Sequence, residues 1–236
     1  AVGMSTSIPP HNLGEVIDAV MAYIDNPDIS TRELMEYMPG PDFPTGGIIA
    51  NKSGLAEIYE TGSGKIKLRG KIDIELGKRK ADKDKMVITE IPYTMIGAGI
   101  NKFLVDVAEL VESKKLTDVV DISNQSNKDG IRIVLELKKD ADVEKIRNIL
   151  YKKTKLEDTY GVNMLAIAGG RPETLNLKGI LKNYLDFQYH NATRKYQALL
   201  EKELEKKEIR EGLIKACDII DLIIAVLRGS KNLKDA

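Results

Sequence analysis

The sequence predicts an α+β fold, in which a domain of mixed strands and helices precedes a long coiled-coil helix or a pair of helices. Between Lys65 and Leu76, charged and apolar residues alternate with a period of two, which is typical of a strand with one apolar face. Between Asn176 and Arg228 there is no proline, and apolar residues recur at gaps of three, four and seven, as in a coiled coil. The elements expected before Asn176 do not alternate strictly, which favours α+β over a parallel βαβ fold.

Two short helices are predicted at the start of the chain. Asn12 can cap a helix over 14–25, because its side chain can accept from free backbone N–H groups. Ser30 and Glu33 have the spacing of a capping box for a second helix that ends near Met38. The first helix has an apolar face formed by Val16, Ile17, Val20, Met21 and Ile24. The proline-rich segment "PGPDFPTGG" follows, so we place a domain boundary after residue 38.

The second predicted domain, residues 39–175, mixes strands and helices. Its expected strands lie over 47–50, 65–76, 85–91, 131–137 and 162–168, and its expected helices over about 98–113 and 142–153. Residues 176–236 form the third part, in which a helix of about 50 residues would be a rod of ~75 Å at ~1.5 Å per residue. Gly212 marks a possible kink or break, which leaves one helix or two.

The segment "TGSGK" at 61–65 resembles the end of a phosphate-binding loop, but its context excludes a nucleotide site. Such a loop needs a glycine where Tyr59 stands, and a Ser or Thr where Ile66 follows Lys65. It must also open a helix, whose free N–H groups face the phosphates, whereas a strand pattern follows here. We therefore interpret "TGSG" as a turn.

Four cations fall on the polar face of the alternating strand: Lys65, Lys67, Arg69 and Lys71. They span about 20 Å at ~3.3 Å per residue, and a phosphate backbone carries one charge every ~3.4 Å per strand. The row can therefore follow a nucleic-acid backbone. Taken by themselves, however, the residues favour an ordinary solvated face whose lysines discourage edge pairing. The residues alone leave both interpretations open.

Composition limits the classes of function. The chain has 36 basic and 36 acidic residues, so any nucleic-acid contact must be a local patch. Cys217 is the single cysteine, which favours a reducing cytoplasm, and the two histidines, His11 and His190, lie too far apart to suggest a metal site. No apolar run approaches the ~20 residues of a membrane span, so we expect no membrane association.

Several phrases stand in one order along the chain: "AVGMSTSIPPHNL", "PGPDFPTGGII", "TEIPY", "DGIRIVLELK", "YGVNMLAI" and "NLKGIL" with "ATRKY". Together they resemble the A subunit of bacterial type IIA DNA topoisomerases, the family that includes the A subunits of DNA gyrase and of its paralogue topoisomerase IV. The resemblance implies that 1–38 is the end of the winged-helix (breakage–reunion) domain. It implies that 39–175 is the tower domain and 176–236 the first coiled-coil arm. We therefore expect this chain to be a fragment.

The resemblance also implies an activity for the parent enzyme. A homodimer of A subunits, with two ATPase B subunits in an A2B2 assembly, cleaves double-stranded DNA and passes a second duplex through the break. Mg²⁺ and ATP act through the B subunit, and the enzyme works on the nucleoid in the cytoplasm. The choice between gyrase and topoisomerase IV stays open.

The nucleophile of that family is a tyrosine preceded by arginine. Every tyrosine of this chain lacks a preceding arginine: Tyr23, Tyr37, Tyr59, Tyr93, Tyr151, Tyr160, Tyr184, Tyr189 and Tyr196. We therefore expect no catalytic or metal-binding residue here, and no cleavage by this chain alone. Tyr93 and Tyr160 are expected to pack within the domain.

Because the family's tower flanks the DNA, the resemblance favours phosphate contacts by Lys65, Lys67, Arg69 and Lys71. Thr45, with the backbone N–H groups of Gly46 and Gly47, is a second candidate, against the alternative that "PGPDFPTGG" is only a linker turn. His11 is expected to be structural. The alternative function is a non-enzymatic nucleic-acid-binding or scaffold module with a coiled-coil arm.

Overall fold

The computed structural model describes residues 3–77, 83–128 and 130–229, and it confirms the α+β class. The chain divides into two compact units, Ala1–Leu181 and Lys182–Ala236. All strands of the described residues belong to the first unit, while the second is helical. The finer division at residues 38 and 175 stays a prediction.

Both N-terminal helices form with the predicted caps. Helix α1 (Leu13–Asp25) begins after Asn12, whose side chain accepts from the N–H groups of Gly14 and Glu15. Helix α2 (Thr31–Tyr37) has both halves of the capping box, and the bonds from Ser30 lower the pKa of Glu33.

The predicted apolar face of α1 is mostly not the packed one. Ile17 and Met21 are 50% and 57% exposed, whereas Ala19 and Tyr23 are buried. Helix α1 packs beside α2, and Lys178 Nζ lies 5.8 Å from the centre of the Tyr23 ring. Periodicity locates an apolar stripe, but it does not show which side a neighbouring element covers.

The first sheet is antiparallel, with strands in the order β1-β2-β7. Its strands are β1 (Ile48–Ile49), β2 (Ser63–Arg69) and β7 (Glu157–Asn163). Between β1 and β2 lie the short helix η1 (Lys52–Gly54) and helix α3 (Leu55–Thr61), which the sequence analysis did not predict. Gly62 ends α3 in the left-handed conformation. The turn predicted for "TGSG" therefore lies where α3 ends and β2 begins.

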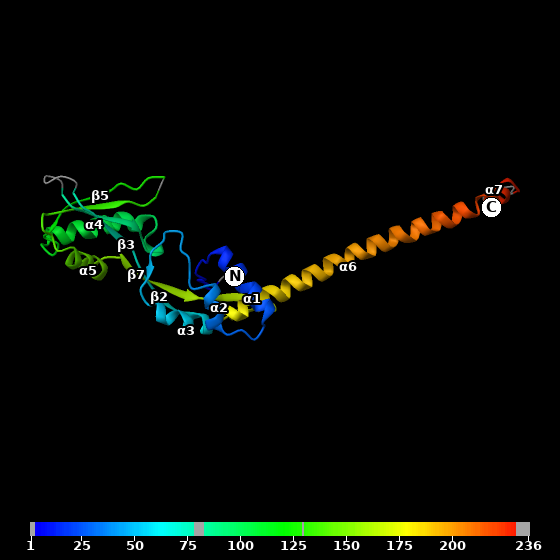
Figure 1. Cartoon of the computed structure of the whole chain (residues 1–236), viewed down its shortest axis with the longest axis horizontal. Coiled ribbons are helices and arrows are strands. Elements are labelled where there is room, and N and C mark those ends of the chain that lie inside the picture. Colours follow the sequence, from blue (N-terminus) through cyan, green and yellow to red (C-terminus); the bar gives the residue numbers. More distant parts are fainter. Residues whose placement is uncertain (1–2, 78–82, 129, 230–236) are drawn as a thin grey trace. The chain divides into compact units, whose positions relative to one another are not determined.

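The second sheet has the order β3-β4-β6-β5, and α4 and α5 cover one of its faces (Figure 1). Its strands are β3 (Lys71–Glu75), β4 (Lys85–Glu90), β5 (Val119–Asn124) and β6 (Ile133–Leu137). Helix α4 (Ala98–Glu112) follows the short helix η2 (Tyr93–Met95), and α5 is Val143–Lys153. Met86, Phe103 and Leu150 belong to the core between sheet and helices.

Two predicted strands are divided in the structure. The strand over 65–76 breaks at Gly70, so β2 and β3 belong to different sheets. The strand over 162–168 becomes the end of β7 and a separate hairpin, formed by β8 (Leu165–Ala168) and β9 (Arg171–Thr174). Gly169 and Gly170 turn this hairpin with positive φ of 56° and 80°.

The predicted long helix is present, but its break lies elsewhere. Helix α6 (Leu177–Asp218) has 42 residues, about 63 Å at ~1.5 Å per residue, and it continues through Gly212. It ends before Ile219, and α7 (Ile220–Gly229) follows. Beyond Leu181 its apolar side chains, such as Phe187 and Leu200, are largely exposed, which fits a coiled-coil arm without its partner. No helix of the described residues is long and apolar enough to cross a membrane.

Candidate nucleic-acid interface

Strand β2 separates its apolar and cationic residues completely. Ile66 and Leu68 are 0% and 1% exposed, whereas Lys65, Lys67 and Arg69 are exposed on the other face. Strand β2 pairs with β7 along its whole length. The predicted alternation of faces is therefore confirmed for this half of the row.

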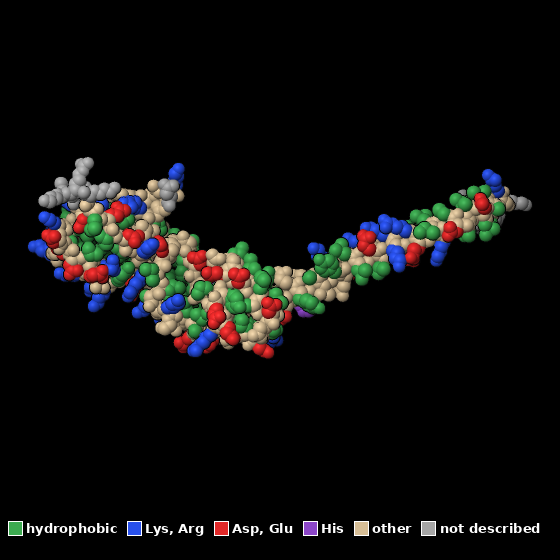
Figure 2. Space-filling view, in the orientation of Figure 1, with side chains coloured by type: hydrophobic (Ala, Val, Ile, Leu, Met, Phe, Trp, Pro, Cys, Tyr) green, Lys and Arg blue, Asp and Glu red, His purple; other side chains and the backbone are tan. Residues whose placement is uncertain are grey.

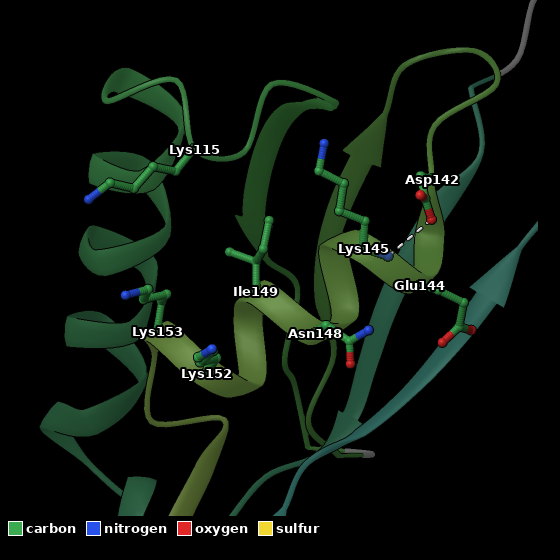
Figure 3. Close-up of a pocket in the computed structure, with 8 residues that line it drawn as sticks. All are labelled: Lys115, Asp142, Glu144, Lys145, Asn148, Ile149, Lys152 and Lys153. Atoms are coloured by element: carbon green, nitrogen blue, oxygen red, sulfur yellow. Dashed lines mark hydrogen bonds between the residues drawn. The ribbon is translucent and has the colours of Figure 1, made fainter.

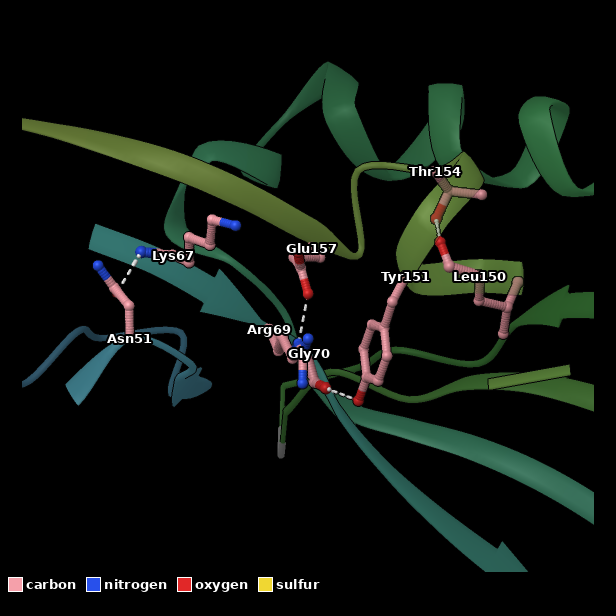
Figure 4. A network of polar contacts seen from close by, with 8 residues as sticks. All are labelled: Asn51, Lys67, Arg69, Gly70, Leu150, Tyr151, Thr154 and Glu157. Atoms are coloured by element: carbon pink, nitrogen blue, oxygen red, sulfur yellow. Dashed lines mark hydrogen bonds and ion pairs between the residues drawn. The ribbon is translucent and has the colours of Figure 1, made fainter. Parts of the chain in front are cut away.

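The other edge of β2 is also closed. Strand β1 pairs with Arg69 and Leu68, and the side chain of Asn51 continues this pairing. The Asn51 side-chain amide donates to the Lys65 carbonyl at 2.8 Å. Its oxygen accepts from the Lys67 N–H at 2.8 Å (Figure 4). Because both edges are paired, discouraging edge pairing does not account for the lysines of β2. No pattern in the sequence singles out Asn51, because its role depends on the distant backbone of Lys65 and Lys67.

The four predicted cations fall into two kinds. Arg69 forms an ion pair with Glu157 and lies 5.2 Å from the centre of the Tyr151 ring (Figure 4). Lys71, on β3, lies 3.6 Å from a Glu90 carboxylate oxygen. Lys65 and Lys67 form no ion pair with any described residue. Their charges are therefore the ones most available to an anionic ligand.

The loop that contains Thr45 uses its N–H groups within the protein. The Gly46 N–H donates to the Phe43 carbonyl at 2.9 Å, and the Gly47 N–H donates to Glu90 Oε2 at 2.6 Å. The Thr45 carbonyl accepts from the Ile91 N–H, and its buried hydroxyl has no partner among the described residues. A phosphate at Gly46 would have to displace these contacts, so the contacts favour the linker-turn interpretation, and the DNA contact of Thr45 and Gly46 stays a prediction.

His11 and the two notable tyrosines have structural contacts. His11 Nε2 lies 2.7 Å from the hydroxyl of Tyr59, and burial lowers the pKa of His11 and raises that of Tyr59. Tyr93 and Tyr160 pack with Phe43, with ring centres 5.7 Å and 5.3 Å from it. These contacts agree with the structural roles expected for all three residues.

The described residues contain no group of three or more His, Cys, Asp or Glu side chains that could hold a metal ion. The candidate interface is therefore the cationic face of β2, a strand that is paired on both edges.

The chain combines an α+β unit that carries a cationic strand with a long helix whose apolar residues are exposed. This combination is expected for a tower domain and its coiled-coil arm. The family profile that describes the A subunit of DNA gyrase/topoisomerase IV matches residues 1–236. The chain therefore belongs to the family of DNA gyrase/topoisomerase IV A subunits.

Curated relatives agree with this assignment. The chain is 49% identical to the DNA gyrase A subunit of Clostridium acetobutylicum over 236 residues, which cover 100% of this chain and 28% of that protein. It is 43% identical to the DNA topoisomerase 4 A subunit of Staphylococcus epidermidis over 234 residues, 99% of this chain and 29% of the relative. For the DNA gyrase A subunit of Synechocystis, the identity is 42% over 238 residues, with 100% and 27% covered. The chain thus spans less than a third of the length of these relatives.

Proposed function

We propose that this chain supports duplex DNA beside the cleavage site of a type IIA topoisomerase, as part of its A subunit. The family match and the names of the relatives support the enzyme class. The observation that carries the DNA contact is the pair of exposed lysines on β2, Lys65 and Lys67, which have no acidic partner among the described residues. Phosphate contacts of this kind position a duplex without reading its sequence.

The proposal extends to the parent enzyme. Two A subunits form a homodimer that works with ATPase B subunits, and ATP-dependent passage of one duplex through another changes supercoiling or linkage. The tyrosine nucleophile lies outside this chain, and Mg²⁺ and ATP are supplied through the B subunit. This chain contributes support for the duplex and the start of the arm toward the exit gate.

The DNA contact is tested by the salt dependence of duplex binding. Each phosphate contact contributes about −0.9 to the slope of log K against log salt, so Lys65→Gln with Lys67→Gln removes about 1.8 from the magnitude of the slope. The matched control is Arg69→Gln with Lys71→Gln, which removes the same charge from cations that Glu157 and Glu90 already neutralise in part. Anisotropy of a labelled duplex gives both slopes. An equal loss in the two variants would contradict the special role of the β2 lysines.

The enzyme class is tested with the full-length parent protein and its ATPase partner. Negative supercoiling of relaxed plasmid with ATP identifies gyrase, and unlinking of DNA circles without supercoiling identifies topoisomerase IV. Absence of both activities, with both proteins folded, would favour the non-enzymatic module instead.

A further inference from the structure

The pair formed by His11 and Tyr59 is enclosed by the fold, whereas charged side chains lie mostly at the surface. Acidic and basic side chains are spread over much of the face seen in Figure 2. On α5, for example, Lys145 and Lys152 line an open groove of about 680 Å³ and end at separate points (Figure 3). Tyr59, in contrast, is 0% exposed, and His11 is partly buried. A charge on this pair is therefore poorly solvated.

The hydrogen bonds of the His11 ring define which nitrogen carries the proton. His11 Nε2 lies 2.7 Å from the Tyr59 hydroxyl oxygen, and the two ring centres are 5.8 Å apart. The backbone of Pro9 also forms a hydrogen bond with the ring. Since proline has no N–H, the ring donates this bond to the Pro9 carbonyl, and Nδ1 is the nitrogen left to do so. In the neutral ring, Nε2 therefore accepts from the Tyr59 hydroxyl.

A second proton on His11 disrupts this arrangement. Both nitrogens of a charged imidazole ring are donors, so the Tyr59 hydroxyl must turn from donor to acceptor. Among the described residues this hydroxyl has no second hydrogen-bond partner, and Tyr59 is closed to water. Turning therefore leaves a buried O–H without an acceptor, which costs free energy.

The charged neighbours of the pair do not remove this cost. Burial has the largest effect on His11 and lowers its pKa, while the Pro9 carbonyl and the Asp42 carboxylate favour the cation to a smaller extent. Burial, together with Glu15 in the first turn of α1, raises the pKa of Tyr59, so its hydroxyl keeps the proton. The enclosed pair is therefore stable in its neutral form.

The pair connects two helices that are distant in the sequence. His11 directly precedes Asn12, the cap of α1, whereas Tyr59 lies within α3. The neighbouring Pro10 carbonyl accepts from the Asp42 N–H at 2.9 Å. Two contacts therefore hold the start of α1, one with α3 and one with the segment after α2.

We propose that His11 and Tyr59 form a pH-sensitive latch, which holds the start of α1 on α3 and releases it when His11 is protonated. The proposal does not depend on the DNA contact of β2. A released His11 has the ordinary pKa of 6.5, and the latched one has a lowered pKa. The latch therefore contributes stability above about pH 6.5, which is lost as the pH falls through the lowered pKa. Glu33, whose pKa is also lowered, acts only below its ordinary value of 4.5.

The first test is an NMR titration of the imidazole rings in the unchanged 236-residue chain. We expect the His11 midpoint to lie below 6.5 and the neutral ring to carry its proton on Nδ1. His190, which is exposed on α6, gives the second histidine signal, and His190→Gln assigns it. A midpoint at or above 6.5, or a neutral ring protonated on Nε2, would overturn the inference.

The second test is amide hydrogen exchange at the starts of two helices. The Val16 N–H donates to the Asn12 carbonyl at 3.0 Å at the start of α1, and the Ile146 N–H makes the equivalent bond to Asp142 at 3.1 Å at the start of α5. Below about pH 6.5 we expect the protection factor of Val16 to fall by up to about tenfold per pH unit, and that of Ile146 to change little. An equal fall at both sites would indicate global unfolding and overturn the latch.

The third test uses variants of the pair. His11→Gln should abolish the pH dependence of exchange at Val16, and the matched control His190→Gln should keep it. Tyr59→Phe retains the ring but removes the hydroxyl that must turn, so it should weaken the pH dependence. A dependence that Tyr59→Phe leaves unchanged would assign the effect to burial of His11 alone and overturn the latch. If His11→Gln does not fold, the titration and the exchange of the unchanged chain still decide.

Discussion

Strands β2 and β3 come from one continuous alternation of charged and apolar residues, yet they have different surroundings. In β2, Ile66 and Leu68 are fully buried, and Lys65 and Lys67 are left without ionic partners among the described residues. In β3, the apolar residues are only partly buried, and its charged residues have partners: Lys71 with Glu90, Asp73 with Thr89 and Glu75 with Arg132. The two halves of one pattern therefore differ. Among the described residues, the lysines of β2 have no ionic partner, whereas the charged residues of β3 are paired.

Gly70 separates the two strands. Its N–H donates to the Leu156 carbonyl at 2.8 Å. Its carbonyl accepts from the Tyr151 hydroxyl at 2.8 Å (Figure 4). A Cβ at this position would overlap the Leu156 side chain and lie 2.8 Å from the Glu90 carbonyl oxygen. The chain can therefore pass from one sheet to the other only because this residue has no side chain.

The largest expected difference between the strands is in core packing. Leu68→Ala on β2 should destabilise the protein by about 3 kcal/mol, since it leaves a cavity in a fully buried site. Ile74→Ala on β3 should cost only about 1 kcal/mol, because its site is partly open. Urea denaturation followed by circular dichroism measures both. Equal losses would show that the two strands are equally important to the core.

The junction is probed by Gly70→Ala, which should cost about 2 kcal/mol because the added methyl group meets Leu156 and the Glu90 backbone. Gly161→Ala on β7 is the control, since a Cβ there meets nothing within 4 Å and its φ is ordinary. The control should be neutral or stabilising by up to about 1 kcal/mol. Thermal denaturation distinguishes the two, and a silent Gly70→Ala would mean that the junction tolerates a side chain.

These details set the limit of prediction from sequence. Caps, most helices and the two faces of β2 follow from local rules, because Asn12, Ser30 and the alternation act over a few residues. The division at Gly70, helix α3 and the role of Asn51 depend on contacts between distant segments, such as Gly70 with Leu156, which no local pattern records. The neutralisation of Arg69 and Lys71 is likewise invisible in sequence, because Glu157 and Glu90 reach them only in the folded chain.

A smaller effect is expected from the hydrogen bond across the junction. Tyr151→Phe removes the donor to the Gly70 carbonyl and should cost about 1 kcal/mol, since the tyrosine is partly buried, which also raises its pKa. Thr89→Val removes the bond to Asp73 on β3, where water replaces it, and should cost less than about 0.5 kcal/mol. Equal costs would mean that the junction bond is as exposed to water as the one on β3.

The smallest effects concern the ion pairs that neutralise each strand. A double-mutant cycle on Arg69 and Glu157 should give a coupling of about 0.2–1 kcal/mol, as should one on Arg132 and Glu75, because all four side chains remain solvent-accessible. Raising the salt concentration to about 1 M should weaken both couplings, since the screening length falls to ~3 Å. Duplex DNA should change the coupling at Arg69 and leave the coupling at Arg132 unchanged. If phosphates bind along β2, they compete with Glu157 for Arg69 and lower that coupling, while the Arg132–Glu75 pair, on the other sheet, keeps its value. A coupling at Arg69 that duplex leaves unchanged would place the bound phosphates at Lys65 and Lys67 alone.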